Sequence, residues 1–196
     1  MAGKTAEAGM GTLILFIAFI LVAAIAAAVL VNTAGSLQSR ALTTGTKTQK
    51  QVSSGISVLT IYGENSSTTA QINYLYATIR LTAGSDPVLL NASLIDVFSG
   101  LISSAYDYNS TGNCTPSWLS NATLASKYFA VQAQEGYTLP GVLQDGDVLL
   151  TCVRLPSGLN ESQKVTWEFS PKSGSFTSIK TETPPVMSMA KVFLFP

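Results

Sequence analysis

The hydrophobic pattern divides the chain into two parts, and the first contains one unbroken apolar run. This run comprises nineteen consecutive apolar residues, Leu13 to Val31, and no charged residue occurs from Ala8 to Ser39. A helix needs about 20 apolar residues to cross the core of a bilayer, so the run is long enough to do so. Because such a helix is apolar on every face, lipid or other protein must surround it on all sides.

The helical pattern continues beyond the apolar run. Leu37, Ala41, Val52 and Ile56 recur near helical spacing, which predicts a helix over about residues 11–57. That helix would be about 70 Å long, whereas a bilayer core is about 30 Å thick. The excess length and the alanine-rich second half of the run favour a helix that bundles with copies of itself, because small residues let helices approach closely. A single membrane anchor is the alternative, and a secretory signal peptide fits less well because its apolar region is shorter.

From Val58 onward the period of the pattern changes from helical to two. Apolar residues alternate with polar or aromatic ones in 73–82 and 164–170, which is typical of half-buried strands. Segments rich in Gly, Pro, Asn and Ser separate further candidate strands, at 58–62, 87–98, 127–134, 147–155, 176–181 and 190–195. The pattern therefore predicts an α+β chain, with a helical part at 7–57 and an antiparallel, immunoglobulin-like β-sandwich at 58–196.

Composition excludes most catalytic and metal chemistry. The chain has no histidine, which excludes Ser-His-Asp triads, Cys-His dyads and imidazole-ligated metals. Its two cysteines are too few for a Cys₄ zinc site or iron–sulfur cluster. The charges of eleven basic and eleven acidic residues cancel, so the chain lacks the excess of positive charge that is typical of nucleic-acid-binding proteins. We therefore expect a non-enzymatic protein without cofactors and without nucleic-acid partners.

The strongest candidate for a metal site is one acidic turn. Asp145-Gly-Asp147 places two carboxylates on a glycine turn, and carboxylate oxygens suit Ca²⁺. Two carboxylates are too few to define a site, so we interpret this segment as a plain turn.

Six of the eight asparagines stand in the glycosylation acceptor pattern N-x-S/T. All six lie beyond the predicted helix, and such acceptors indicate a surface outside the cell: Asn65, Asn91, Asn109, Asn113, Asn121 and Asn160. The alternative is that Ser- and Thr-rich loops produce the pattern by chance. Asn91 is the least loop-like of the six because it falls in a strand-like run.

The two cysteines suit the same compartment. An even number of cysteines in an exported domain favours a disulfide between Cys114 and Cys152, and two buried thiols are the alternative. If Cys114 is bridged, we expect Asn113 to be the sequon least accessible to a transferase.

Two groups of residues are candidates for contacts with neighbouring subunits. Only Lys4 precedes the apolar run, whereas Arg40, Lys47 and Lys50 follow it. The positive-inside rule alone would place the C-terminal side in the cytoplasm, against the sequons and cysteines. This conflict indicates that the three later cations contact acidic groups on neighbouring subunits, and a solvated helix face is the alternative. Tyr74 and Tyr76 are predicted on the outer face of their strand. There we expect them to pack under a neighbouring subunit or under a loop, or simply to cover their own sheet.

The N-terminal segment resembles archaellins, the archaeal flagellins. The resemblance rests on G-M-G-T-L-I-L-F-I-A at 9–18, the alanine-rich run after it, and N-T-A-G-S-L-Q at 32–38. It covers about 30 residues closely and continues more loosely to about Ile56. Weaker echoes lie in V-L-Q-D-G-D-V at 142–148 and in the apolar C-terminal strand.

The resemblance implies a type-IV-pilin-like subunit of an archaeal surface filament that rotates for swimming. Such a subunit is membrane-inserted before assembly, loses its leader to a prepilin-type peptidase, and then joins a helical filament of many copies driven by a membrane motor. The sandwich faces outward and is often N-glycosylated. The helices pack in the filament core, which here implies packing by Leu13, Phe16, Phe19, Ala23, Ala24, Ala27 and Leu30.

Alignment with the family motif also implies a leader at 1–6, with cleavage between Ala6 and Glu7. Typical type IV pilins carry a glutamate five residues into the mature chain, and Gly11 stands there in this sequence. This difference favours an archaellin over a bacterial-type pilin. An archaeal adhesion pilin remains the runner-up. A singly anchored surface binding module is the rival from another class.

Overall fold

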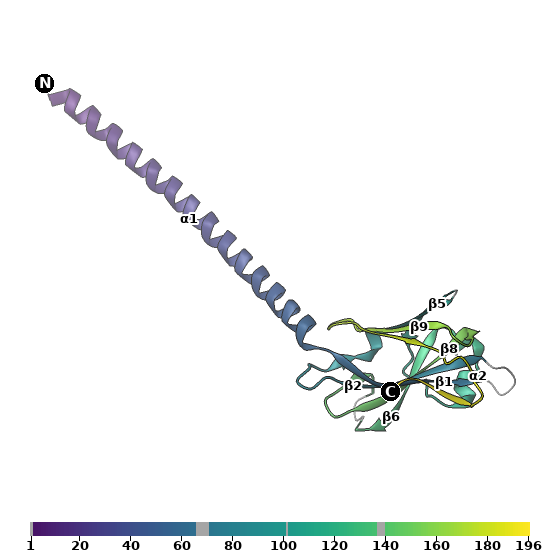
Figure 1. Cartoon of the computed structure of the whole chain (residues 1–196). Coiled ribbons are helices and arrows are strands. Elements are labelled where there is room, and N and C mark those ends of the chain that lie inside the picture. The colour runs from purple at the N-terminus through teal and green to yellow at the C-terminus, as the bar shows by residue number, and fades with distance from the viewer. Residues whose placement is uncertain (1, 66–70, 101, 137–139) are drawn as a thin grey trace. The chain divides into compact units, whose positions relative to one another are not determined.

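The computed structural model describes residues 2–65, 71–100, 102–136 and 140–196, with the side chains of 2–8, 50–53 and 65 left out of the description. The chain divides into two compact units, Met1–Thr48 and Gln49–Pro196. The first is helical and the second consists mainly of strands (Figure 1).

Helix α1 comprises Ala2–Ser53, which confirms the long N-terminal helix but shifts both of its ends. It begins earlier than the predicted Gly11, although the residues before the apolar run contain as many Gly and Thr residues as the good helix formers Ala, Lys and Glu. It ends before the predicted Ser57 because Ser54 and Gly55 bond to loops of the domain. The amide of Ser175 donates to the Ser54 carbonyl at 2.9 Å, and the amide of Thr82 donates to the Gly55 carbonyl at 2.9 Å.

Nine strands of the domain form one hydrogen-bonded succession, in the order β10-β9-β4-β5-β6-β8-β2-β1-β11. A separate two-stranded sheet pairs β3 (Val88–Leu89) with β7 (Val142–Leu143). The nine strands are β1 (Ile56–Asn65), β2 (Ile72–Leu81), β4 (Leu94–Ser99), β5 (Ile102–Tyr108), β6 (Tyr128–Glu135), β8 (Val148–Leu159), β9 (Lys164–Ser170), β10 (Thr177–Glu182) and β11 (Lys191–Phe195).

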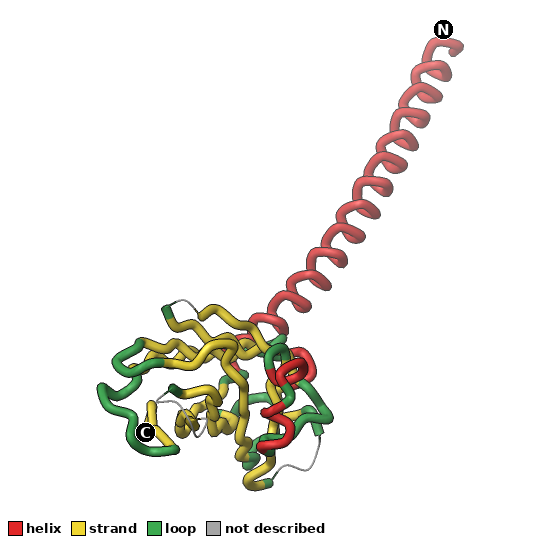
Figure 2. The backbone as a smooth tube through the Cα atoms, turned by 90° about the vertical axis from the view of Figure 1, so that its right-hand side faces the viewer, coloured by secondary structure: helices red, strands yellow, loops and turns green. Residues whose placement is uncertain are grey.

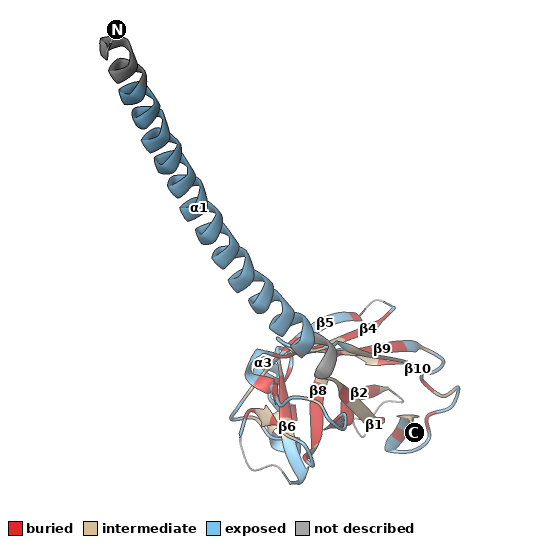
Figure 3. Ribbon diagram, turned by 90° about the vertical axis from the view of Figure 1, so that its left-hand side faces the viewer, coloured by how far each residue is buried: buried red, intermediate tan, exposed pale blue. Residues whose placement is uncertain are grey.

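The nine strands form two layers around one core (Figures 1 and 3). The first layer is β10-β9-β4-β5 and the second is β6-β8-β2-β1-β11. They are joined by a short parallel pairing of β5 with β6, at Asp107↔Tyr128 and Tyr108↔Phe129, while the other strand pairs are antiparallel. The core contains large, fully buried side chains from both layers, including Trp167, Tyr106 and Phe129.

The mainly antiparallel sheet domain agrees with the prediction, but two local predictions were wrong. The run 87–98 is not one strand, because Leu90–Ala92 forms the 3-10 helix η1 and splits it into β3 and β4. Ser93 stabilises this break, since its hydroxyl donates to the Leu89 carbonyl at 2.8 Å. Strand β5 was not predicted, because Ser104 stands at an inward position and Ala105 at an outward one, which breaks the alternation of apolar and polar residues.

One row of side chains crosses the outer face of the second layer. Residues in register from edge to interior are Phe193, Tyr62, Tyr76, Cys152 and Ala130. The connection from β5 to β6 covers the interior end of this row with the short helices α2 (Pro116–Ser120) and α3 (Ala122–Ala125) (Figure 2). The domain therefore has a second, smaller core on its outer side.

Candidate assembly helix and exported surface

The apolar side chains of helix α1 are exposed along its described length. From Met10 to Leu42, the large apolar residues are 49–73 % exposed. Figure 3 shows this part of the helix in the blue that marks exposed residues. Segment Gly9–Gln49 is long and apolar enough to cross a membrane, with a mean hydropathy of 3.2 over its most apolar window and none of that window buried. All seven residues assigned to filament-core packing are exposed: Leu13, Phe16, Phe19, Ala23, Ala24, Ala27 and Leu30.

This exposure defines what the helix requires. Fully burying one Leu, Ile, Val or Phe side chain contributes about 1.5–3 kcal/mol, and the helix exposes more than a dozen of them. A helix that is apolar all round is stable only in lipid or within a protein bundle. Every face of α1 is therefore a candidate surface for contact with lipid or with other helices.

The polar side chains of the helix are compatible with burial. The hydroxyl of Thr12 donates to the Gly9 carbonyl at 2.9 Å, and that of Thr33 donates to the Val29 carbonyl at 2.7 Å. Thr43 likewise donates to the Ser39 carbonyl at 2.9 Å. Because these three hydroxyls bond within the helix, burying them leaves none of the three without a partner. The pattern of apolar residues did not predict these hydrogen bonds. The threonines on either side of the apolar run were the feature of the sequence that indicated them.

Two of the three cations that follow the apolar run, Arg40 and Lys47, are exposed. The part of the helix whose side chains are described, residues 9–49, contains no acidic residue to pair with them. The side chain of Lys50 lies outside the described residues, as do those of Ala6 and Glu7 at the predicted cleavage position.

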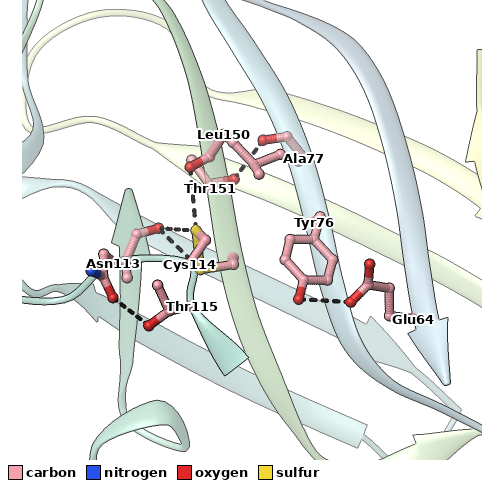
Figure 4. Close-up of a disulfide and its surroundings, with 10 residues drawn as sticks. Glu64, Tyr76, Ala77, Asn113, Cys114, Thr115, Leu150 and Thr151 are labelled. Carbon is pink, nitrogen blue, oxygen red and sulfur yellow. Dashed lines mark hydrogen bonds between the residues drawn. A yellow bond between two sulfur atoms is a disulfide. The ribbon is translucent and has the colours of Figure 1, made fainter. Parts of the chain in front are cut away.

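A disulfide joins Cys114 to Cys152, with their Cα atoms 5.7 Å apart (Figure 4). Cys152 belongs to the row of side chains on the outer face of the second layer, and Cys114 lies two residues before the start of α2. Leu119 is buried in the same cluster, and Trp118 packs against it. A hydrogen bond also joins β8 to α2, because Nη1 of Arg154 donates to the Ser120 carbonyl at 3.0 Å. The alternative of two separate thiols does not apply to this structure.

Tyr76 lies under the β5–β6 connection that carries α2 and α3. On its other side, contacts lead from Tyr76 to the charged residues Glu64 and Lys191. Tyr76 is 5 % exposed and stacks on Tyr62, with ring centroids 4.9 Å apart. Its hydroxyl donates to Glu64 at 3.0 Å, and Glu64 forms an ion pair with Lys191 at 3.2 Å. Burial raises the pKa of Tyr76, and the Glu64 carboxylate raises it further, so Tyr76 stays protonated. Of the three predicted covers for Tyr74 and Tyr76, the loop is the one present within this chain.

The sequons lie at strand ends or between strands, and none lies inside a strand of the first layer. Asn113 is exposed despite its bridged neighbour, and Asn91 lies exposed in η1 instead of in a strand. Asn121 is also exposed and caps α3, accepting from the amides of Thr123 and Leu124. Asn160 is exposed after β8, and Asn109 is half-buried after β5. Asn65 ends β1, and its side chain lies outside the described residues.

Three sequons share a side-chain geometry. The carboxamide oxygen of Asn113 accepts from the Thr115 hydroxyl at 2.7 Å, and that of Asn109 accepts from the Thr111 hydroxyl at 2.8 Å. In Asn160 the oxygen accepts from Gln71 at 2.8 Å. In each of the three the carboxamide oxygen is thus held by a hydrogen bond within the domain.

The Asp145-Gly-Asp147 segment is a turn held by its own carboxylate. Asp147 is 4 % exposed, and its Oδ2 accepts from the amide of Gln144 at 2.9 Å. Within the described residues, no group of three or more His, Cys, Asp or Glu could hold a metal ion. The carboxylate of Asp147 is thus used to fix the chain.

Known proteins resemble this chain along most of its length. The family model for archaeal-type flagellin matches residues 6–181. Flagellin B1 of Methanocaldococcus jannaschii is 34 % identical over 201 residues, covering 94 % of this chain and 92 % of that protein. Flagellin B1 of Thermoplasma volcanium is 42 % identical over 142 residues, covering 70 % of this chain and 55 % of that protein.

Two solved structures share the fold. The archaeal flagellum of Methanospirillum hungatei matches with a TM-score of 0.69 and 17 % identity, covering 96 % of this chain and 99 % of that one. The crystal structure of an archaeal flagellin from M. jannaschii matches with a TM-score of 0.64 and 20 % identity, covering 72 % and 97 %. The chain therefore belongs to the archaeal-type flagellins, as a non-enzymatic structural subunit of the archaeal surface filament, the archaellum.

Proposed function

We propose that the filament forms by bundling of the segment 7–57 in its core, with the domain at 58–196 facing outward. The single observation that carries this proposal is a helix with large apolar side chains exposed on every face. In the membrane, lipid covers these side chains before assembly. In the filament, other copies of the helix cover them, and the alanines permit close approach. Transfer from membrane to filament then exchanges one apolar surrounding for another.

Processing and decoration complete this proposal. A prepilin-type peptidase cuts between Ala6 and Glu7, which frees the helix for extraction from the membrane. N-linked glycans occupy the six sequons on the outward domain, and an assembly platform with a motor in the membrane rotates the filament for swimming. The exposed positions of Asn91, Asn113, Asn121 and Asn160 support decoration. A role in swimming predicts that deletion of the gene abolishes motility, whereas an adhesion pilin predicts loss of surface attachment with normal swimming.

The helix core is tested by a charge at its alanine-rich half. Ala24→Asp is expected to remove shed filaments, because an unpaired carboxylate buried among apolar helices costs several kcal/mol per subunit. Ala24→Ser is the matched control, because a serine hydroxyl is small and can donate to its own helix backbone. The measurement is the amount of chain in sheared, pelleted filaments. Wild-type amounts from Ala24→Asp would contradict the proposed core.

A further inference from the structure

The outward face of β4 and β9 differs from the rest of the domain surface. Where β4 and β9 pair, its residues are Leu94, Asp96, Phe98, Thr166, Glu168 and Ser170, which we call the bare face; Lys164, at the start of β9, lies on the same side of the sheet. The residues that alternate with them, including Val97 and Trp167, are buried in the core. The bare face is therefore the solvent side of the first layer.

Two carboxylates lie opposite each other on the bare face. Asp96 and Glu168 are directly paired in the β4–β9 register, and both are half-buried. The Ser178 hydroxyl donates to Glu168 at 2.9 Å, but among the described side chains no Lys or Arg forms an ion pair with either carboxylate. Burial, and then the charge of Glu168, raises the pKa of Asp96. Like charges directly opposite in a sheet are destabilising. Lys180 lies on the same side of the sheet, opposite Thr166 in β10, but it forms no ion pair with either carboxylate.

Apolar side chains flank the carboxylates. Phe98 is 41 % exposed and Leu94 is 39 % exposed, on the same strand as Asp96 and on either side of it. On β9 the neighbours of Glu168 are the polar residues Thr166 and Ser170. Two large apolar side chains exposed close together on β4 favour a surface that another protein covers.

The bare face also carries no glycan acceptor. The stretches 94–108 and 164–182, which contain all four strands of the first layer, contain no asparagine. Three sequons instead occupy the β5–β6 connection, which covers the second layer. A glycan is bulky and keeps a surface solvated, so the absence of acceptors leaves this face available to protein.

The chain itself contains the complement of the bare face. Residues 1–53 hold four basic residues and one acidic residue, whereas residues 54–196 hold seven basic and ten acidic residues. On helix α1, Leu37, Arg40, Thr44 and Lys47 follow at intervals of three or four residues, and so share one face. This stripe presents two exposed cations beside an exposed leucine.

We propose that, in the filament, the bare face of one copy docks on the Leu37–Lys47 stripe of helix α1 of another copy. Arg40 and Lys47 neutralise Asp96 and Glu168, while Leu37 covers part of the apolar flank. An arginine guanidinium is suited to a carboxylate pair because it offers several donors in one plane. The inference rests on the proposed assembly of copies through α1, and it names the second surface that this assembly uses.

The test is a charge exchange in a host whose other filament-subunit genes are deleted. Asp96→Lys with Glu168→Lys is expected to lower the chain in sheared, pelleted filaments by about tenfold or more, because like charges then face each other across the interface. Arg40→Glu with Lys47→Glu is expected to give the same loss. All four substitutions together are expected to restore most of the filament. Wild-type yield from the first pair, or no recovery in the fourfold variant, would overturn the proposal.

Two controls separate this interface from general effects. Glu135→Lys with Asp145→Lys makes the same charge change at exposed positions away from the bare face, and its filament yield should stay within about twofold of wild type. A loss there as large as at the bare face would overturn the specific contact. Asp96→Asn with Glu168→Gln relieves the repulsion within the sheet, so this variant folds; it should still lower filament yield, and an unchanged yield would count against docking.

The Ala24→Asp variant separates a failure of the proposed helix core from a failure of the docking inference. If that variant still forms filaments, the proposed helix core fails. If it forms none while the bare-face variants form normal filaments, only the docking inference fails.

Discussion

Several buried polar side chains of the domain have internal hydrogen-bond partners. The Thr151 hydroxyl donates to the Ala77 carbonyl at 2.9 Å, and the Ser99 hydroxyl donates to the Lys164 carbonyl at 2.7 Å. Tyr106, which is fully buried, donates to the Arg154 carbonyl at 2.7 Å and so ties β5 to β8 across the core. Such bonds matter because an unpaired buried polar group costs about 1–3 kcal/mol.

Tyr106 gives the domain a sensitivity to alkaline pH. Burial raises its pKa to about 12, although a hydrogen bond with Ser104 lowers it in part, whereas an unfolded tyrosine titrates near 10. The protonated side chain therefore contributes its full stability below about pH 10, and this contribution is lost as pH rises through about 12. The loss is on the order of 2–3 kcal/mol.

Tyr106→Phe removes this titration. We expect the variant to lose about 1–3 kcal/mol of unfolding free energy at neutral pH, because the Arg154 carbonyl loses its partner. Between about pH 10 and 12 its stability should then fall less steeply than that of the wild type. Urea unfolding of the full chain in detergent at several pH values measures both effects. Equal slopes over this range would show that Tyr106 does not titrate as described.

Among the elements, the α2–α3 segment depends on a single covalent tie. The segment covers Tyr76 and Leu150 on the outer face, yet its two helices have five and four residues. Helices this short are not stable alone. The Cys114–Cys152 bridge, with a sequence separation of 38, holds the segment in place.

Replacing both cysteines with alanine should destabilise the domain and open this segment. The expected loss is about 2–4 kcal/mol of unfolding free energy in the loop-entropy account of disulfides. Lys127 follows α3 and is exposed, so trypsin should cut after it faster in the variant than in the wild type. Limited proteolysis with mass analysis checks this, and Lys127→Gln in the variant should remove the new fragment. An unchanged cleavage rate would mean that packing of Trp118 and Leu119 suffices without the bridge.

The elements that sequence predicts best are those whose pattern repeats over many residues. Helix α1 and strands β2 and β9 have strong periods, and all three were predicted within a few residues except for the helix start. Strand β5 and the covering segment depend on partners distant in sequence, so no local pattern reveals them. The outer position of Tyr76 followed from alternation, but its cover depends on which connection crosses that face.

The candidate surface was likewise predicted in part. The apolar circumference of α1 is visible in the sequence because every position of the run is apolar. The Asp96–Glu168 pair is not, because 72 residues separate its members and only the β4–β9 register brings them together. The exposure of Asn113 was also missed, because a bridged neighbour buries the sulfur and leaves the asparagine side chain outside.

The molecule as a whole is neutral, but its charge is divided between its two units. An excess of three basic residues lies before Ser54, and an excess of three acidic residues lies after it. A chain with this division is complementary to further copies of itself, and its apolar helix requires either lipid or other helices around it. Charge and hydrophobicity thus both favour a polymer.

The central claim, that the chain is an exported and processed filament subunit, is tested most directly by its intact mass in sheared, pelleted surface material. The account predicts a chain that is abundant there without detergent, lighter by residues 1–6 and heavier by sugar at the sequons. A full-length, unmodified chain found only in detergent-extracted membrane would contradict it.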